Sequence, residues 1–262
     1  MEDKIVNMED DMYRFMRYKA YARFKIKPVR VRHLTEMMND QTLDFLQSRP
    51  GILYEPRFKT TAEVFKSPTD KYNILEFWSK ARRDGQVYPT PAIISYPTDS
   101  NNATGNIRPV CQYPADIAIG EAQFALPLLK GFLEDKKTPM AYALGIATES
   151  PRCLRSELCP KKYYGTRNFE SFDESLRRNL IRDAFFVLWQ NFELGAYEGW
   201  EIPNVENMRH QYFYIMSYYL RTQTVCISRA EIGVQSGHLP SGSHFTPLID
   251  IVLYWMLVTY GY

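Results

Sequence analysis

Three stretches with the apolar pattern of helices dominate the second half of the sequence. They cover residues 174–192, 205–220 and 244–260. Such stretches must bury their apolar faces against other elements, which restricts the chain to a packed helical core. Only short strand-like stretches accompany them. The sequence therefore predicts a mostly helical α+β fold.

Shorter elements are expected in the first half of the chain. Thr60 and Glu63 have the spacing of a capping box, and Pro127 is expected to interrupt the helix that contains it. Prolines and a glycine make residues 86–106 loop-like. Helical patterns cover residues 8–22, Thr35 to about Gln47, Asp70 to just before Gly85, and 119–133.

A basic stretch lies near the start of the chain, whose net charge is only +2. Between residues 14 and 32 it has eight basic side chains and no acidic one. A local concentration of positive charge is typical of a surface that binds a polyanion. The eight residues of this basic stretch are Arg14, Arg17, Lys19, Arg23, Lys25, Lys27, Arg30 and Arg32.

Two interpretations of the basic stretch remain open. Phe15, Tyr18, Tyr21 and Phe24 lie between its charges. Aromatic faces and cations together bind single-stranded nucleic acid by stacking and phosphate contacts. An amphipathic helix with core aromatics and solvated charges has the same pattern. Residues 23–32 alternate between basic and apolar, which favours a strand or an extended arm with one charged face.

Cysteine usage and hydropathy restrict the location of the protein. The cysteines, at 111, 153, 159 and 226, form no CxxC pair and no zinc pattern, so free thiols in a reducing compartment are expected. The N-terminus lacks the apolar core of a signal peptide. The longest uncharged apolar run, Ile251–Val258, is far shorter than the about 20 residues of a membrane span. We expect a protein of the cytoplasm or of a particle interior, not secreted.

Single candidate residues give weaker signals. Ser241 lies near two histidines, but its segment lacks the G-x-S-x-G pattern of a hydrolase, and Gly242 favours a tight turn. Asp173 has the place of an acidic residue at a helix N-terminus. Arg108 follows a flexible loop and is either surface charge or a fork that binds a triphosphate.

Three segments in order along the chain are similar to motifs of one enzyme family. Residues 107–129, IRPVCQYPADIAIGEAQFALPLL, resemble a fingers motif with R-P-V, Y-P and E-A-x-F-A-x-P-L. Residues 168–188, NFESFDESLRRNLIRDAFFVL, resemble a first palm motif, D-W-S-x-F-D, followed by L-I-R-D-A-F. Residues 239–250, LPSGSHFTPLID, resemble a second palm motif, P-S-G-S-x-F-T-x-L-x-D. The chain thus resembles the RNA-directed RNA polymerases of partitiviruses, which are double-stranded RNA viruses.

This resemblance implies a right-hand fold, here incomplete, with fingers and part of the palm and no thumb. It implies RNA template and product and ribonucleoside triphosphates as partners, two Mg²⁺ ions as cofactors, and a location in the cytoplasm or the virion. A viral capsid protein is a further candidate partner. The implied division is a basic extension with outer fingers over 1–85, fingers over 86–165, palm over 166–195, a fingers–palm insertion over 196–232 and palm over 233–262.

The resemblance also implies roles for single residues. Arg108 would contact the incoming triphosphate. Ser241, Gly242 and Ser243 would form the loop that binds template and nucleotide. The first hundred residues match the family only loosely, so the expectation that the basic stretch binds RNA depends on its own charges and aromatics.

Palm positions both match the family and depart from it. Asp173 would read the ribose hydroxyl, and Thr246 would support ribose selection. The first metal-binding Asp is replaced by Asn168, whose neutral amide is a poor ligand for Mg²⁺. Asn106 stands where a Lys is usual, and Tyr254 where an Asn is usual.

The G-D-D motif of the family does not occur within the 262 residues, and the sequence ends where the palm should continue. Two explanations remain open: a partial sequence of a working polymerase, or a catalytically dead, RNA-binding relic of a captured viral gene. Either way, we expect no catalysis by this chain alone. We also expect the apolar face of 244–260 to lack partner strands, with Phe245, Leu248, Ile251, Val252 and Trp255 left without cover.

Overall fold

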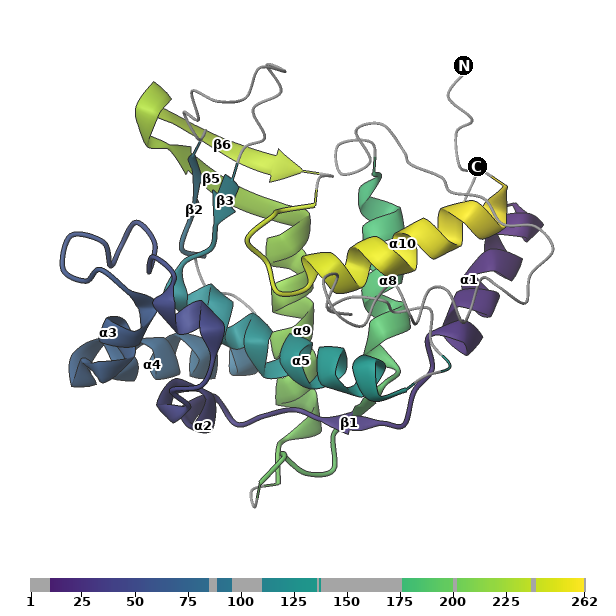
Figure 1. Cartoon of the computed structure of the whole chain (residues 1–262), viewed down its shortest axis with the longest axis horizontal. Coiled ribbons are helices and arrows are strands. Elements are labelled where there is room, and N and C mark those ends of the chain that lie inside the picture. The colour runs from purple at the N-terminus through teal and green to yellow at the C-terminus, as the bar shows by residue number, and fades with distance from the viewer. Residues whose placement is uncertain are drawn as a thin grey trace, which may run out of the picture.

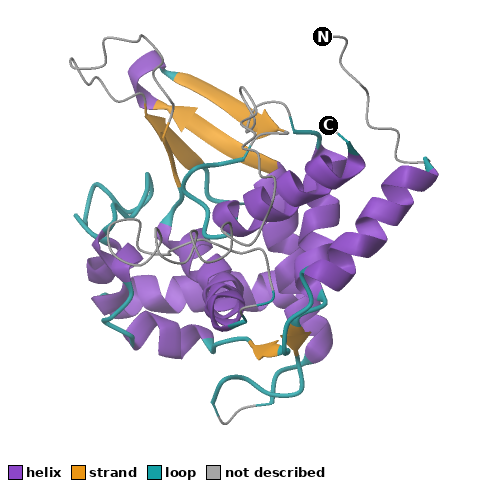
Figure 2. Ribbon diagram, turned by 45° about the vertical axis from the view of Figure 1, so that its right-hand side comes forward, coloured by secondary structure: helices purple, strands orange, loops and turns teal. Residues whose placement is uncertain are grey.

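A computed structural model gives an α+β fold with a predominance of helix, as the sequence predicts (Figures 1 and 2). The structure describes residues 10–84, 89–95, 110–135, 137, 176–199, 202–236 and 239–261. A four-stranded sheet lies at one end of the molecule, above the helices in Figure 1.

Helices form most of the described chain. They are α1 (Asp11–Arg23), α2 (Leu34–Asn39), α3 (Thr61–Lys66), α4 (Pro68–Asp84), α5 (Ala115–Glu134), α8 (Arg178–Trp189), α9 (Val205–Leu220) and α10 (Thr246–Tyr260), with 3-10 turns η1 (Asp44–Gln47) and η2 (Ile227–Arg229). No described helix is long and apolar enough to cross a membrane.

Short strands form two sheets. They are β1 (Val29–Arg30), β2 (Ala92–Ser95), β3 (Val110–Gln112), β4 (Phe192–Glu193), β5 (Arg221–Cys226) and β6 (Glu231–Ser236). The larger sheet has the order β3-β2-β5-β6, in which β2 is antiparallel to β3 and parallel to β5, and β5 and β6 form an antiparallel hairpin. β1 and β4 form a separate two-residue parallel pair.

Helix α9 occupies the centre and packs on α4, α5 and α8. Its buried Tyr212 ring makes edge contacts with Phe124 of α5, Phe185 of α8 and Phe245 before α10. Such aromatic pairs are worth about 0.5–1.5 kcal/mol each beyond their buried area. Helices α5, α8 and α9 and the start of α10 are therefore joined at one aromatic cluster.

Helix α10 matches the predicted apolar segment, but the expectation that it lacks partners is wrong. It packs on α1 and α8, and in Figure 1 it lies across the front of α8. Phe245, Leu248 and Val252 are fully buried, and Ile251 and Trp255 are partly buried against the core. Helices take the place of the expected strands.

Helix α5 runs through Pro127 without a break, contrary to the predicted interruption. A proline has no N–H to donate to the carbonyl four residues earlier, which here belongs to Gln123. That carbonyl accepts a bond from the backbone N–H of Arg32 at 3.2 Å. A distant segment thus satisfies the group that the proline leaves unpaired.

The predicted helix starts are confirmed in part. Thr60 caps α3 by accepting the Glu63 N–H at 3.4 Å, while the Glu63 carboxylate accepts the Lys59 N–H at 2.7 Å. The expected cap at Thr35 is wrong, because His33 Nδ1 accepts the Thr35 N–H at 3.3 Å.

Asp70, expected to cap α4, lies inside its first turn. It accepts a bond from the Ser67 hydroxyl at 2.7 Å, and its N–H donates to the Ser67 oxygen at 3.4 Å. Arg57 donates to the same carboxylate at 2.6 Å. The Arg57 guanidinium holds the pKa of Asp70 below its ordinary value.

Helices α4 and α5 approach closely at Gly120. A Cβ at this position would lie 2.0 Å from Cζ2 of the buried Trp78 ring. The ring has little freedom to move, because its Nε1 donates to the Asp116 carbonyl at 2.8 Å. We expect Gly120→Ala to lower the free energy of unfolding by about 1–3 kcal/mol, the usual cost of overpacking a core.

Urea unfolding followed by circular dichroism tests this expectation. Gly195→Ala is the matched control, since its nearest contact would be the Glu193 side-chain oxygen at 3.6 Å. The control should change stability by less than about 0.5 kcal/mol. Equal midpoints for the Gly120 variant and the unmodified chain would contradict the close approach.

Candidate functional site

The three motif segments are described to different extents. The structure describes 239–250 fully, 107–129 from Val110 onward, and 168–188 from Leu176 onward. The predicted site residues Arg108, Asn168 and Asp173 lie outside the described residues. The geometry therefore bears on the loop of the third segment and on the elements that hold it.

The loop formed by residues 239–245 packs against strand β3 of the first segment. The Cys111 backbone N–H donates to the Ser241 Oγ at 3.0 Å. At Gly242 a Cβ would lie 1.9 Å from the Cys111 carbonyl oxygen, so only a glycine permits this approach. The first and third segments are in direct contact, 130 residues apart in the chain.

A buried carboxylate holds the other side of this loop. Glu121 of α5 is fully buried. It accepts bonds from the Ser243 hydroxyl at 2.8 and 2.9 Å and from the His244 N–H at 2.9 Å. The Ser243 oxygen in turn accepts the Phe245 N–H at 3.0 Å. The loop is therefore fixed between α5 and β3.

Burial sets the protonation states at this contact. It raises the pKa of Glu121 to about 8, although the bonds from Ser243 and His244 favour the ionised form. Burial also lowers the pKa of His244 to about 4. Both groups are thus neutral near pH 7, which reduces the cost of keeping them from water.

Thr246, predicted to support ribose selection, bonds within the protein. Its hydroxyl donates to the Pro240 carbonyl at 2.5 Å and lies 3.1 Å from the Tyr219 hydroxyl. Ser241 and Gly242, in contrast, are exposed, while Ser243 is buried. Of the predicted loop residues, Ser241 and Gly242 are the ones available to a ligand.

The described part of the second segment forms α8 and contacts the basic stretch. Asp183 of α8 is buried and accepts a bond from the Tyr13 hydroxyl at 2.5 Å. Arg17 lies 3.6 Å from the same carboxylate. One of the predicted RNA-binding cations, Arg17, thus has a buried carboxylate of α8 as its partner.

The basic stretch combines both predicted interpretations. It forms helix α1, whose Phe15 and Tyr18 are 51% and 69% exposed, followed by an extended segment that contains β1. Phe24 is fully buried and Tyr21 partly so. Two of the four aromatics are thus available for stacking, and two belong to the core.

Several cations of the basic stretch form ion pairs or hydrogen bonds within the protein. Arg30 pairs with Glu193 at 2.9 Å and Arg32 with Asp40 at 2.9 Å. Arg23 donates to the Lys137 carbonyl at 2.8 Å, and Arg14 lies 3.6 Å from the exposed Asp11. Lys19, Lys25 and Lys27 are exposed and form no ion pair within the described residues.

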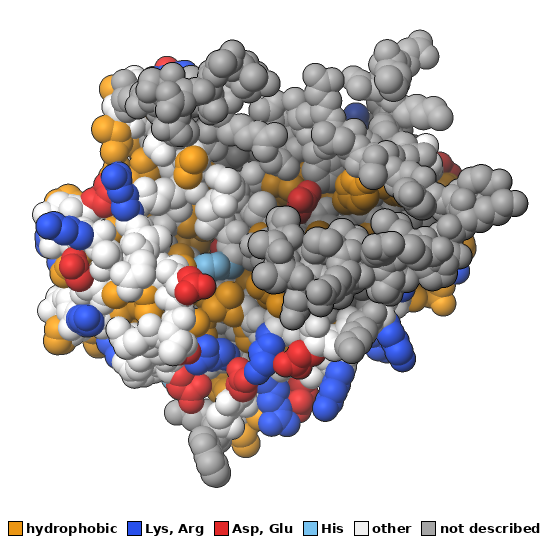
Figure 3. Space-filling view, in the orientation of Figure 1, with side chains coloured by type: hydrophobic (Ala, Val, Ile, Leu, Met, Phe, Trp, Pro, Cys, Tyr) orange, Lys and Arg blue, Asp and Glu red, His pale blue; other side chains and the backbone are white. Residues whose placement is uncertain are grey.

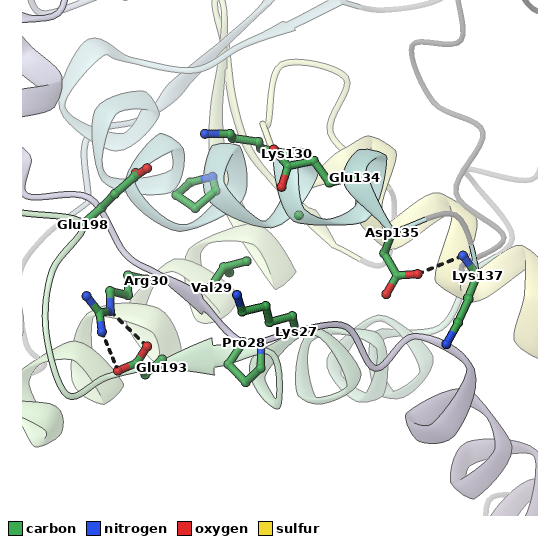
Figure 4. Close-up of a pocket in the computed structure, with 12 residues that line it drawn as sticks. Lys27, Pro28, Val29, Arg30, Lys130, Glu134, Asp135, Lys137, Glu193 and Glu198 are labelled. Atoms are coloured by element: carbon green, nitrogen blue, oxygen red, sulfur yellow. Dashed lines mark hydrogen bonds and ion pairs between the residues drawn. The ribbon is translucent and has the colours of Figure 1, made fainter.

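A groove of about 710 Å³ lies between β1 and the C-terminal half of α5 (Figure 4). Figure 4 shows Arg30 bonded to Glu193 and the Lys137 backbone bonded to Asp135. The groove is lined by equal numbers of basic and acidic residues, which are Lys27, Arg30, Lys130 and Lys137 against Glu134, Asp135, Glu193 and Glu198. The space-filling view likewise shows Lys and Arg interspersed with Asp and Glu along the lower edge (Figure 3).

Other predictions have partial outcomes. Of the four cysteines predicted to be reduced, the described Cys111 and Cys226 form no disulfide, and burial raises the pKa of Cys111 to about 12. Among the described residues, no three or more His, Cys, Asp or Glu side chains are grouped as metal ligands. Tyr254, which departs from the family pattern, lies on α10 and is 36% exposed.

Sequence reasoning missed Glu121. This residue lies in the E-A-x-F-A stretch of the fingers-like segment, and the resemblance implies no role for it. The available signal was a carboxylate within a mostly apolar helical run, because such groups are rarely buried without partners. The partners Ser243 and His244 are more than 120 residues away, so the sequence alone does not reveal them.

Comparison with known proteins adds no assignment: no protein-family model matches the chain, and no curated protein matches it.

Replacement of Gly242 tests the contact between loop and strand. We expect Gly242→Ala to push the loop off β3 and to expose the Cys111 thiol. A loss of about 1 kcal/mol of local packing would raise the open population about fivefold. The rate of Cys111 alkylation, measured by mass spectrometry of the labelled peptide, should rise accordingly.

Cys226 on β5 serves as the internal control, since it is also buried but lies outside the loop contact. Its alkylation rate should stay unchanged. Equal acceleration at both cysteines would indicate global unfolding, and no acceleration at Cys111 would contradict the close approach of Gly242.

Proposed function

We propose that this chain is part of an RNA-directed RNA polymerase of a partitivirus-like double-stranded RNA virus, and that its right-hand fold carries fingers and part of a palm. The reaction is template-directed nucleotidyl transfer from ribonucleoside triphosphates. One observation carries the proposal: the fingers-like and second palm-like segments, distant in sequence, meet at Cys111, Ser241 and Gly242. An accidental resemblance would give no reason for these two segments to be in contact.

The proposed roles follow from exposure and chemistry. Ser241 and Gly242 are exposed on a loop held from beneath, which suits contact with template and nucleotide. Arg108, two residues before β3, would bind the triphosphate near this loop, because a guanidinium matches phosphate oxygens bidentately. Asp173 would accept a hydrogen bond from the ribose hydroxyl.

The residues of this chain fit a pair of magnesium ions poorly. The position of the first metal ligand is Asn168, and a neutral amide is a weak substitute for a carboxylate. Two-metal phosphoryl transfer needs carboxylates to hold both ions. We therefore propose that the 262 residues bind RNA and nucleotide but do not catalyse nucleotide addition by themselves.

A catalytically dead RNA-binding relic is the second candidate function. The outer face of α1 favours it, because exposed Phe15 and Tyr18 lie beside exposed Lys19. Lys19 Nζ is 5.1 Å from the centre of the Phe15 ring. Stacking surfaces beside free cations bind single strands without need of catalytic residues.

RNA binding by the basic stretch can be tested on its three exposed lysines. We expect simultaneous replacement of Lys19, Lys25 and Lys27 by Gln to weaken binding to a single-stranded RNA. Loss of three phosphate contacts should make the slope of log affinity against log salt shallower by about 2. The arginines are left intact, because their ion pairs contribute to the fold. Fluorescence anisotropy over a salt series measures both quantities.

The matched control replaces three exposed lysines elsewhere, Lys59, Lys66 and Lys80, by Gln. It changes net charge equally and should leave the slope nearly unchanged. If both variants lose the same slope, binding depends on overall charge, and the basic stretch is not the RNA surface. No binding by the unmodified chain at low salt would argue against both candidate functions.

Catalysis is tested by labelled-nucleotide incorporation on an RNA template with Mg²⁺ or Mn²⁺. We expect no product from the purified 262 residues, because Asn168 replaces a metal-binding carboxylate. Product that requires metal and template, and that disappears in Arg108→Ala, would contradict this expectation. Product that persists in Arg108→Ala indicates a contaminating polymerase.

A further inference from the structure

Glu121 is a buried carboxylate whose neighbours include no cation among the described residues. A buried ionisable group without a counter-ion costs free energy, so its presence in an apolar helix needs a reason. Its hydrogen bonds all go to one place, the loop formed by residues 239–245. None serves the packing of α5 itself.

The contacts form a chain from this carboxylate to the exposed part of the loop. Glu121 accepts bonds from Ser243 and His244, which fixes the backbone on the far side of Gly242. Gly242 in turn lies against the Cys111 carbonyl, and Ser241 accepts the Cys111 N–H. Release of Ser243 and His244 would remove the polar contacts between the loop and α5, and would leave the contact with β3 and the packing of Phe245 in the aromatic core.

We propose that Glu121 is the positioning residue of this loop: it holds Ser243 and His244 so that Ser241 and Gly242 are presented at a fixed place. This inference rests on the proposed function for its role at template and nucleotide. The contact of Glu121 with Ser243 and His244 is seen in the structure and does not depend on that function.

The proton on Glu121 then controls the loop. When protonated, the carboxyl keeps one oxygen to accept the His244 N–H and has a hydroxyl to donate to the Ser243 oxygen. When ionised, it is a negative charge in an apolar site, with no compensating cation. Burial raises its pKa to about 8 in the closed loop, against an ordinary value of 4.5.

The sign of the pH effect follows from these two values. Between pH 4.5 and 8 the closed loop binds a proton that the opened loop releases, so opening becomes easier as pH rises. Between pH 4.5 and 6.5 protonation of His244 in the opened loop opposes this effect, so the equilibrium constant for opening should rise mainly above pH 6.5, by up to about tenfold per pH unit, and level off above pH 8.

Other titratable groups near Glu121 do not change their protonation state between pH 6.5 and 8. On β3, burial raises the pKa of Cys111 to about 12 and that of Tyr113 well above its ordinary value. Burial also raises the pKa of Tyr218 on α9. His244 in the loop titrates at about 4 when buried and about 6.5 when free. Above pH 6.5, Glu121 is the group that changes.

Amide hydrogen exchange of the full chain, corrected for the intrinsic effect of pH, tests the proposal. Protection of the Ser243 and His244 amides should fall about 15-fold between pH 6.5 and 8. Glu121→Gln, a neutral group of the same shape, should remove this pH dependence. Asp116→Asn is the matched control on the same helix, since Asp116 bonds to Thr90 and Ile117 and not to the loop.

A second variant covers the case in which Glu121→Gln does not fold. Ser243→Ala removes the hydroxyl that the carboxylate holds, so protection of the His244 amide should fall at every pH while α9 stays protected. Unchanged protection in Ser243→Ala would overturn the proposal. So would a pH dependence in Glu121→Gln equal to that of the unmodified chain.

Binding of a 12-nucleotide single-stranded RNA, measured at pH 6.5 and 8 on the same proteins, separates the two proposals. We expect affinity to fall with pH in the unmodified chain and to stay constant in Glu121→Gln. If loop protection responds to pH and RNA affinity does not, Glu121 positions the loop and the assigned contact of the loop with RNA is wrong.

Discussion

The aromatic contacts of Tyr212 are the interaction on which the rest of the structure depends. Its ring meets Phe124, Phe185 and Phe245, and its hydroxyl donates to the Phe185 carbonyl at 2.8 Å. Helices α5, α8 and α9 and the start of α10 thereby share one centre. Because protein interiors are close-packed, the position of each of these elements fixes that of the others. The loop before α10 is thus placed by the core before any polar contact orients it.

Polar contacts then give this loop its detailed position. An apolar surface can hold a loop near a strand, but it does not determine which atoms face outward. The bonds from Ser243 and His244 to Glu121 are directional, and the Gly242 approach to Cys111 is sterically narrow. Together they leave Ser241 and Gly242 exposed above a rigid support. Rigid supports of this kind are what sites need to keep their geometry.

Local patterns in the sequence predicted single helices better than the contacts between distant segments. Helix α9 was predicted with its correct limits, because its pattern is regular and Asn204 caps it by accepting the Asn207 N–H. The break at Pro127 was wrong, because the compensating donor is Arg32, far away in the chain. The partners of α10 and the role of Glu121 were missed for the same physical reason. Each depends on contacts between segments whose proximity no local pattern encodes.

The parallel pairing of β2 with β5 has a consequence for how the molecule assembles. Ala92 is opposite Thr224, and Cys111 contacts Ser241. Formation of the sheet and of the loop contact therefore joins residues that are far apart in the chain. Closing such stretches costs entropy before any contact repays it, and folds rich in distant contacts form slowly. On a ribosome, the early helices would emerge with their future partners still unsynthesised. The loop that carries Ser241 and Gly242 is therefore among the last parts to take its native form, and nascent chains would expose apolar strand edges until then.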